Sequence, residues 1–164
     1  TSLEGRIGRK TFWLGSVVMI VVSIVTSIVA NMVTGGFNMT PATDADAAMA
    51  AFRTSFWANI IVFIIIAWPV SALMIKRRHD RGSAGMEVWA YIGIALFAQL
   101  LTAIGFDYSA TMMPGTNAYF VTPGIISGGL GFIVGIFAIY LLVVCGFLKG
   151  NEGDNAYGPD PLAN

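Results

Sequence analysis

Charged residues are scarce in this sequence, at 11% of 164 residues, whereas a soluble domain carries roughly 25%. Hydrophobic residues make up 56% of the chain. A soluble fold of this length keeps too much surface to hide so many apolar side chains from water. The composition therefore excludes an ordinary soluble domain and indicates a protein whose solvent is lipid.

Cysteine and histidine are nearly absent, since the chain has only Cys145 and His79. One cysteine excludes a disulfide bond within the chain, and a structural zinc site needs about four Cys or His ligands. The net charge is zero, so no global field favours nucleic acid. We expect no cofactor, no metal and no nucleic-acid partner, and the informative charges are local ones.

The sequence contains four long apolar runs, at residues 12–33, 56–75, 86–106 and 125–148. Each is close to the roughly 20 residues that a helix needs to cross a bilayer core. Lipid leaves each backbone no hydrogen-bond partners outside its own helix. The first run is too long and uninterrupted for a cleaved signal peptide, so we interpret it as a retained span. The sequence predicts an all-α polytopic membrane protein with four transmembrane helices in a bundle.

We expect one membrane domain over residues 1–164, with a tail at 149–164. Residues 44–55 are Ala-rich and predict a short surface helix before the second span. Residues 107–124 contain two prolines and two glycines among few helix formers, so we expect an irregular loop there. Residues 38–40 match a glycosylation acceptor, a motif that is common by chance.

The basic residues predict the orientation of the spans, because Lys and Arg concentrate in cytoplasmic connections. They alternate between rich and poor connections along the chain. Residues 1–11 hold Arg6, Arg9 and Lys10, residues 76–85 hold Lys76, Arg77, Arg78 and Arg81, residues 34–55 hold only Arg53, and residues 107–124 hold none. We therefore expect both the N-terminus and the C-terminus in the cytoplasm.

Two spans carry small or polar residues at every fourth position, a spacing that places them on one helix face. The first span has Ser23, Ser27 and Asn31, and the fourth has Ser127, Gly131 and Gly135. Such stripes let helix backbones approach closely. One interpretation is packing within the predicted bundle. The other is a docking face for a second copy or another subunit.

Three polar motifs fall on the predicted cytoplasmic side, at residues 5–13, 76–85 and 150–161. The first reads GRIGRKTFW, the second KRRHDRGSAG and the third GNEGDNAYGPDP. In this order and at these places relative to the spans, the motifs resemble the DUF805 family of bacterial inner-membrane proteins, whose function is unknown. The resemblance covers nearly the whole chain and implies a fold and a membrane, but no reaction. Arg78 and Met86 depart from the family, where Leu and an aromatic residue are usual.

The motifs suggest three roles for the candidate inner-face residues. The basic residues pair with Asp80 and the tail acids in one cap, or they bind anionic lipid head groups, or they dock a partner's acidic surface. The sequence leaves these readings open. The candidates are Arg6, Arg9, Lys76, Arg77, Arg78, His79, Asp80, Arg81, Asp154, Asn155, Tyr157 and Asp160.

Catalysis is not expected from these motifs. His79 and Asp80 are adjacent in sequence, a poor geometry for a base and its orienting acid. Ser83 lacks the motif of an activated nucleophile. The sequence instead predicts a scaffold or accessory subunit. Its expected partners are membrane lipids, anionic lipids among them, or a larger membrane complex, or a second copy of itself.

The alternative is a small channel or transporter component. Ion-coupled carriers keep ionisable residues inside their spans, whereas the predicted span interiors here have none and Glu87 lies at a span edge. Asn59 and Gln99 are among the few polar side chains there.

Overall fold

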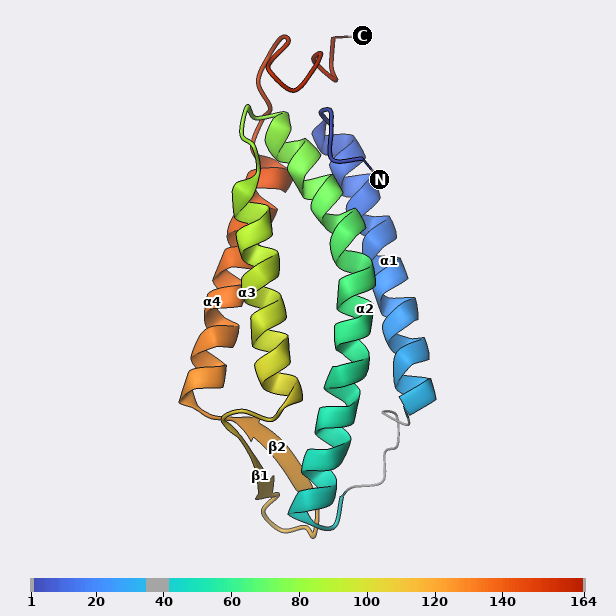
Figure 1. The fold of residues 1–164 in the computed structure, drawn as a ribbon, viewed down its shortest axis with the longest axis vertical. Coiled ribbons are helices and arrows are strands. Elements are labelled where there is room, and N and C mark those ends of the chain that lie inside the picture. The colour runs from blue at the N-terminus through green and yellow to red at the C-terminus, as the bar shows by residue number, and fades with distance from the viewer. Residues whose placement is uncertain (1, 35–41, 164) are drawn as a thin grey trace. The chain divides into compact units, whose positions relative to one another are not determined.

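A computed structural model describes residues 2–34 and 42–163 of the chain. The predicted glycosylation acceptor at residues 38–40 lies outside these described residues. The described elements are α1 (Arg9–Thr34), α2 (Ala45–His79), α3 (Met86–Ala103), β1 (Tyr108–Met112), β2 (Tyr119–Pro123), α4 (Ile125–Leu142) and η1 (Val143–Phe147), a short π-helix that continues α4 (Figure 1).

Four helices in the described residues are long and apolar enough to cross a membrane: α1, α2, α3, and α4 together with η1. This confirms the predicted multi-pass membrane protein. The apolar side chains of α1 are largely exposed, and Phe12 is its one buried residue. Lipid is the solvent that such a surface requires.

The second helix begins earlier than its apolar run. Residues 45–55 continue directly into the span instead of forming a separate surface helix. Asp44 caps this start, because its Oδ1 accepts a hydrogen bond of 2.7 Å from the backbone N–H of Ala47. Alanine favours the helical conformation strongly, so the Ala-rich stretch extends the span beyond the apolar core.

The prediction of an all-α fold was wrong at residues 107–124, which form an antiparallel hairpin. Strand β1 pairs with β2 in a register that sets Tyr108 opposite Pro123 and Met112 opposite Tyr119. The aromatic, Thr and Val residues of both strands favour extended backbone. Gly115, at φ +78°, lies in the turn between them. Pro123 occupies the last position of β2, where no further ladder bond is needed.

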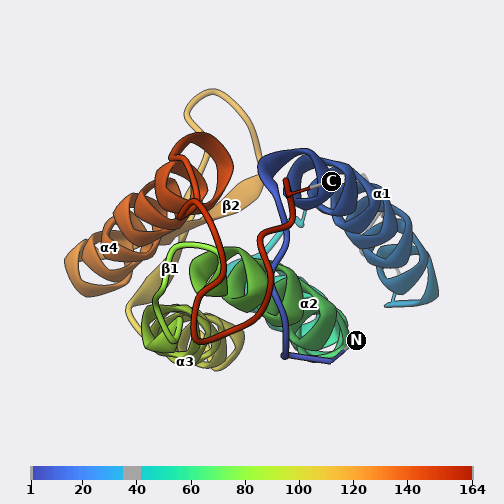
Figure 2. The same cartoon turned by 90° about the horizontal axis from the view of Figure 1, so that it is seen from above.

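The described chain divides into two compact units. Unit 1 comprises residues 1–24, 64–93 and 135–164, and unit 2 comprises residues 25–63 and 94–134. The core of unit 1 is formed by Ile75, Val88 and Leu141, one residue from each of α2, α3 and α4. In Figure 2 the C-terminal segment of unit 1 lies across the end of α2.

In unit 2, Asp107 holds the connection between the hairpin and α4. It adopts a left-handed conformation with φ 57°, which Asp tolerates better than most residues. Its Oδ2 accepts hydrogen bonds of 2.8 and 3.0 Å from the backbone N–H groups of Ile126 and Ser127. Asp107 thereby satisfies donors that the first turn of a helix leaves without partners.

Candidate functional site

The three polar motifs come together in unit 1. We call the assembly of residues 2–8, 76–85 and 148–162 the cap. Asp80, one residue beyond α2, lies at its centre. Its backbone carbonyl accepts a 2.8 Å hydrogen bond from the N–H of Asn151. The predicted convergence of the motifs is thus present in the structure, and a single aspartate lies between two of them.

Asp80 shares its carboxylate between two arginines, and we call these three residues the ion cluster. Arg6 Nη2 lies 3.1 Å from Asp80 Oδ1, and Arg77 Nη1 pairs with Asp80 Oδ2. The side chains of Arg6, Arg77 and Asp80 are only 1%, 0% and 5% exposed. A buried charge is tolerated only when it is paired and its remaining donors are bonded. Two cations face one anion here, so other acceptors are needed.

Arg6 finds its other acceptors in the C-terminal segment. Its Nη1 donates to the carbonyl oxygens of Gly153 at 2.7 Å and Gly158 at 3.2 Å. Its Nη2 donates to the carbonyl of Asn151 at 2.8 Å. Arginine suits this role because its planar guanidinium carries five donors in a fixed geometry. One side chain near the start of the chain therefore holds a segment about 150 residues away in sequence.

Arg77 finds its other acceptors at the end of α4. Its Nε donates to the carbonyl of Cys145 at 2.8 Å, and its Nη2 donates to that of Leu148. The last carbonyls of any helix lack partners within the helix and carry partial negative charge. A guanidinium at this place satisfies both the hydrogen bonds and the dipole.

The π-helix η1 and the residue after it, Leu148, present four consecutive carbonyls to side-chain donors. Besides the two that bind Arg77, the carbonyl of Gly146 accepts a 3.1 Å bond from Trp13 Nε1. The carbonyl of Phe147 accepts a longer bond of 3.4 Å from Arg9 Nη1. Short π-helical turns are frequent at functional sites. Here the turn joins α1, α2 and α4 at one end of unit 1.

His79 and Tyr157 form the aromatic part of the cap. Their rings stack at a centroid distance of 4.0 Å and an interplanar angle of 6°. His79 Nδ1 lies 3.1 Å from the carbonyl oxygen of Gly5, and Asn155 Nδ2 donates to the carbonyl of His79 at 2.9 Å. Each of these contacts ties the end of α2 to one of the other two motifs. His79 thus orders the cap.

The tail acids shape the C-terminal segment itself. Asp160 accepts backbone hydrogen bonds of 2.8 Å from Gly153 and 2.9 Å from Leu162. The backbone bonds to Leu162 and Gly153 lower the pKa of Asp160 below its ordinary value. Asp154 Oδ1 accepts a 3.2 Å bond from the N–H of Asp160. These two carboxylates therefore fold the segment, while Arg6 binds its carbonyls.

The other basic candidates lie outside the ion cluster. Arg78 pairs with Glu87 and donates to Ser83 Oγ at 3.1 Å. Arg9, Lys76 and Arg81 make no ion pair among the described residues. The Nε of Arg81 is buried without a hydrogen-bond partner in the described chain. Positive charge therefore remains uncompensated around the cap.

The small-residue stripes lie partly on open faces. A Cβ added at Gly131 or Gly135 meets no heavy atom within 4 Å in the described chain. On α1, Asn31 Nδ2 donates to the carbonyl of Ser27 at 2.7 Å, and Ser23 Oγ donates to that of Met19 at 2.7 Å. Ser127 Oγ donates to the carbonyl of Phe106 at 2.8 Å. The hydroxyls of Ser23 and Ser127 and the amide of Asn31 are satisfied locally, and the glycines leave room beside α4.

The polar side chains of the ion cluster bind one another and backbone carbonyls. The described residues contain no group of three or more His, Cys, Asp or Glu side chains that could hold a metal ion. Cys145 is buried against α2, with its Sγ 4.0 Å from the carbonyl of Met74. The ion cluster offers charge-assisted bonds whose acceptors are already in place.

Comparison with known proteins gives the family. The sequence pattern described as "Protein of unknown function (DUF805)" matches residues 1–159. The chain belongs to the DUF805 family. This DUF805 chain is 26% identical over 160 residues to an uncharacterized protein, YiiR, of Escherichia coli K12, a match that spans 97% of this chain and 85% of the relative. The YiiR protein of Escherichia coli O157:H7 matches equally well. No solved structure matches.

Sequence reasoning missed several parts of this DUF805 cap. The carbonyls at residues 145–148 and 151–158 have no signature in side-chain chemistry. Trp13, the last residue of the first motif, bonds η1 through its Nε1. Gly150, the first residue of the third motif, lies against the carboxylate of Asp80. Every residue carries a backbone carbonyl, so residue types give no signal for these contacts.

Proposed function

We propose that this DUF805 protein is a non-catalytic multi-pass protein of the bacterial inner membrane that acts by binding, as a scaffold or accessory subunit. The observation that supports this role is the burial and bonding of the charged residues in the motifs. Arg6, Arg77 and Asp80 are almost fully buried, and their polar atoms bind each other and backbone carbonyls. A reactive site keeps a nucleophile or base beside a position that a substrate can reach. An ion cluster whose members already bind one another and backbone carbonyls favours a fixed binding surface over a reactive site.

The charge around the cap supports placing it in the cytoplasm. Eight of the nine Lys and Arg residues lie at 6–10, 76–81 or 149, and Arg53 is the ninth. Such an excess is typical of cytoplasmic connections. In this placement the uncompensated Arg9, Lys76 and Arg81 face anionic head groups or the acidic surface of a partner.

Thiol labelling tests this topology. Cys145 is buried, so new cysteines at exposed positions stand out from the background. We expect Asn117→Cys, in the hairpin turn, to react with an impermeant maleimide from the periplasmic side, and Ala84→Cys, in the cap, to react only after the membrane is opened. Labelling of both cysteines from one compartment would contradict the topology and the cytoplasmic cap.

Gentle purification of the full chain from its native membrane tests the binding role. We expect a protein partner in fixed stoichiometry, or retained anionic lipid, or both, with retention lowered in Lys76→Gln or Arg81→Gln. Reconstituted vesicles supply the contrary outcome. Solute flux that disappears in Asn59→Leu or Gln99→Leu, with no partner and no lipid retained, would replace this proposal by a channel or carrier.

A further inference from the structure

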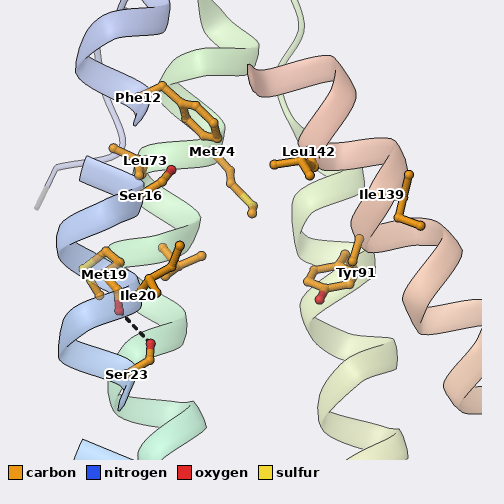
Figure 3. Close-up of a pocket in the computed structure, with 12 residues that line it drawn as sticks. Phe12, Ser16, Met19, Ile20, Ser23, Leu73, Met74, Tyr91, Ile139 and Leu142 are labelled. Atoms are coloured by element: carbon orange, nitrogen blue, oxygen red, sulfur yellow. Dashed lines mark hydrogen bonds between the residues drawn. The ribbon is translucent and has the colours of Figure 1, made fainter. Parts of the chain in front are cut away.

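A cavity of about 360 Å³ lies within unit 1, below the cap. Figure 3 shows α1 and α2 on one side of it and α3 and α4 on the other. Its volume is within the roughly 300–1,000 Å³ of small-molecule pockets. The wall is apolar except for Ser16, Ser23 and Tyr91. Its lining residues are Phe12, Ser16, Met19, Ile20, Ser23, Val70, Leu73, Met74, Tyr91, Ala138, Ile139 and Leu142.

The cavity is reached from lipid. Ile20 on α1 and Ile139 on α4 line it and are 57% and 62% exposed, so its rim is the outer surface of two spans. Phe12, at the cap end, is buried. Beyond Phe12, Trp13 joins α1 to η1, because its Nε1 bonds the carbonyl of Gly146 and its ring packs edge-on against Phe147 at 5.5 Å. The rim at Ile20 and Ile139 is thus the side from which a lipid chain can enter.

The length of α1 that lines the cavity matches the length of one acyl chain of a lipid. From Phe12 to Ser23, α1 rises about 17 Å at the usual helical pitch. The hydrocarbon of one leaflet is half of a core of about 30 Å. Trp13 lies at the cap end of this stretch, where aromatic residues mark the head-group level. An acyl chain that starts at the head group thus spans the cavity.

Arg9 supplies a cation at the cap end of the cavity. Its position, three residues before Phe12 and seven before Ser16, places it on the cavity-lining face of α1. Arg9 is exposed, makes no ion pair in the described chain, and has a single long hydrogen bond of 3.4 Å, to Phe147. Most of its five donors are thus free, and guanidinium binds phosphate in two places at once.

Two hydroxyls in the wall also lack partners. Ser16 and Tyr91 line the cavity (Figure 3), and neither hydroxyl has a hydrogen-bond partner among the described residues. A hydroxyl without a partner is unfavourable in an apolar surrounding. The ester carbonyls of a phospholipid are acceptors for such groups.

We propose that this cavity and Arg9 form a binding site for one anionic phospholipid, with its phosphate on Arg9 and one acyl chain between α1 and α4. The inference rests on the proposed function only through the placement of the cap at the head-group level. It names anionic phospholipid as the ligand. It also places the charged contact at Arg9, at the start of α1, and not in the connection between α2 and α3.

Native mass spectrometry of the whole protein in detergent tests the site. Phosphatidylglycerol and phosphatidylcholine with identical chains are added in equal amounts. We expect one phosphatidylglycerol to be retained in preference. Arg9→Gln should lower this retention about fivefold, because a basic residue near a membrane surface contributes about 1 kcal/mol to anionic lipid binding. Lys10→Gln, which makes the same change of charge on the neighbouring face, should change it less than twofold.

Filling the cavity tests whether an acyl chain of the lipid occupies it. Ala138→Phe introduces a ring into the wall and should lower retention of both lipids, whereas Val18→Phe, on an exposed face of α1 outside the cavity, should not. Ser16→Leu repeats the test if Ala138→Phe unfolds on heating earlier than wild type.

Three outcomes would overturn the site. They are equal retention of the two lipids, equal loss in Arg9→Gln and Lys10→Gln, and undiminished retention in both filled variants. None of them removes a copurified protein partner or the part of lipid retention that depends on Lys76 and Arg81, so the site and the binding role fail separately.

Discussion

Replacing Asp80 by asparagine is expected to destabilise unit 1 by about 3–5 kcal/mol, the usual effect of removing one partner from a buried ion pair. The substitution keeps the size of the side chain and removes its charge. Arg6 and Arg77 then remain buried beside each other with no anion between them. Their mutual repulsion adds to the loss of attraction, because the low polarity of the surroundings strengthens both.

Thermal unfolding in detergent, followed by tryptophan fluorescence, measures this effect. We expect the melting temperature of Asp80→Asn to fall by roughly 10 °C. Glu152→Gln is the matched control, since it also neutralises a carboxylate paired with a cation, but at an exposed position. Exposed pairs contribute little, so its melting temperature should not move measurably. Equal melting of wild type and Asp80→Asn would show that the ion cluster does not hold the cap.

Gly150→Ala is expected to have the second largest effect, because it releases the C-terminal segment. A Cβ at residue 150 would collide with the carboxylate of Asp80, which is fixed by two arginines. Neither group moves without breaking the ion cluster. Overpacking of this kind typically costs about 1–3 kcal/mol.

Hydrogen exchange detects the release directly. The N–H of Asn151 bonds the carbonyl of Asp80, and the N–H of Asn155 bonds that of Gly158. We expect both amides to exchange faster in Gly150→Ala. Gly93→Ala, on α3, serves as the control, since a Cβ there meets no heavy atom within 4 Å and alanine favours the helix. Unchanged protection at residues 151 and 155 would mean that the segment tolerates the methyl group.

The spans of this protein follow from its sequence because their solvent is uniform. An apolar run of about 20 residues has one stable solution in lipid. Hydropathy predicts the ends of a span less well. The start of α2 at residues 45–55 depends on capping by Asp44 and on the helix propensity of alanine more than on hydropathy. The hairpin was missed because Pro114, Gly115, Pro123 and Gly124 were taken to break all regular structure. Tyr108, Thr111, Tyr119 and Val121 carried the opposite signal.

The candidate site was predictable in place but not in detail. Alternating basic connections grouped Arg6, Arg77 and Asp80 at one end of the spans, and the structure brings them into contact. The sequence favoured pairing between arginines and the tail acids as one reading. In the structure the arginines bind tail carbonyls, while Asp154 and Asp160 bind tail N–H groups. Backbone acceptors exist at every residue, so composition cannot select among them.

The cavity lay beyond the reach of sequence reasoning for a related reason. Its wall combines ordinary apolar residues of four helices, and only their placement leaves a gap. Arg9 was predicted as a candidate for lipid or cap contacts, but its alignment with Phe12 and Ser16 gains meaning only beside α4. The volume of a cavity depends on how neighbouring helices pack, so residue types alone do not predict it.

The way Arg6 and Arg77 are satisfied has a consequence for biosynthesis. Ribosomes deliver the N-terminal part of a chain first, so both arginines emerge long before the carbonyls of residues 145–158 that they bind. During that interval Asp80 has already been made, whereas the carbonyls that complete the bonding of both arginines have not. Closure of the cap therefore waits until residues 145–158 have been made, and a ribosome that stops before residue 145 leaves both arginines without these carbonyl acceptors.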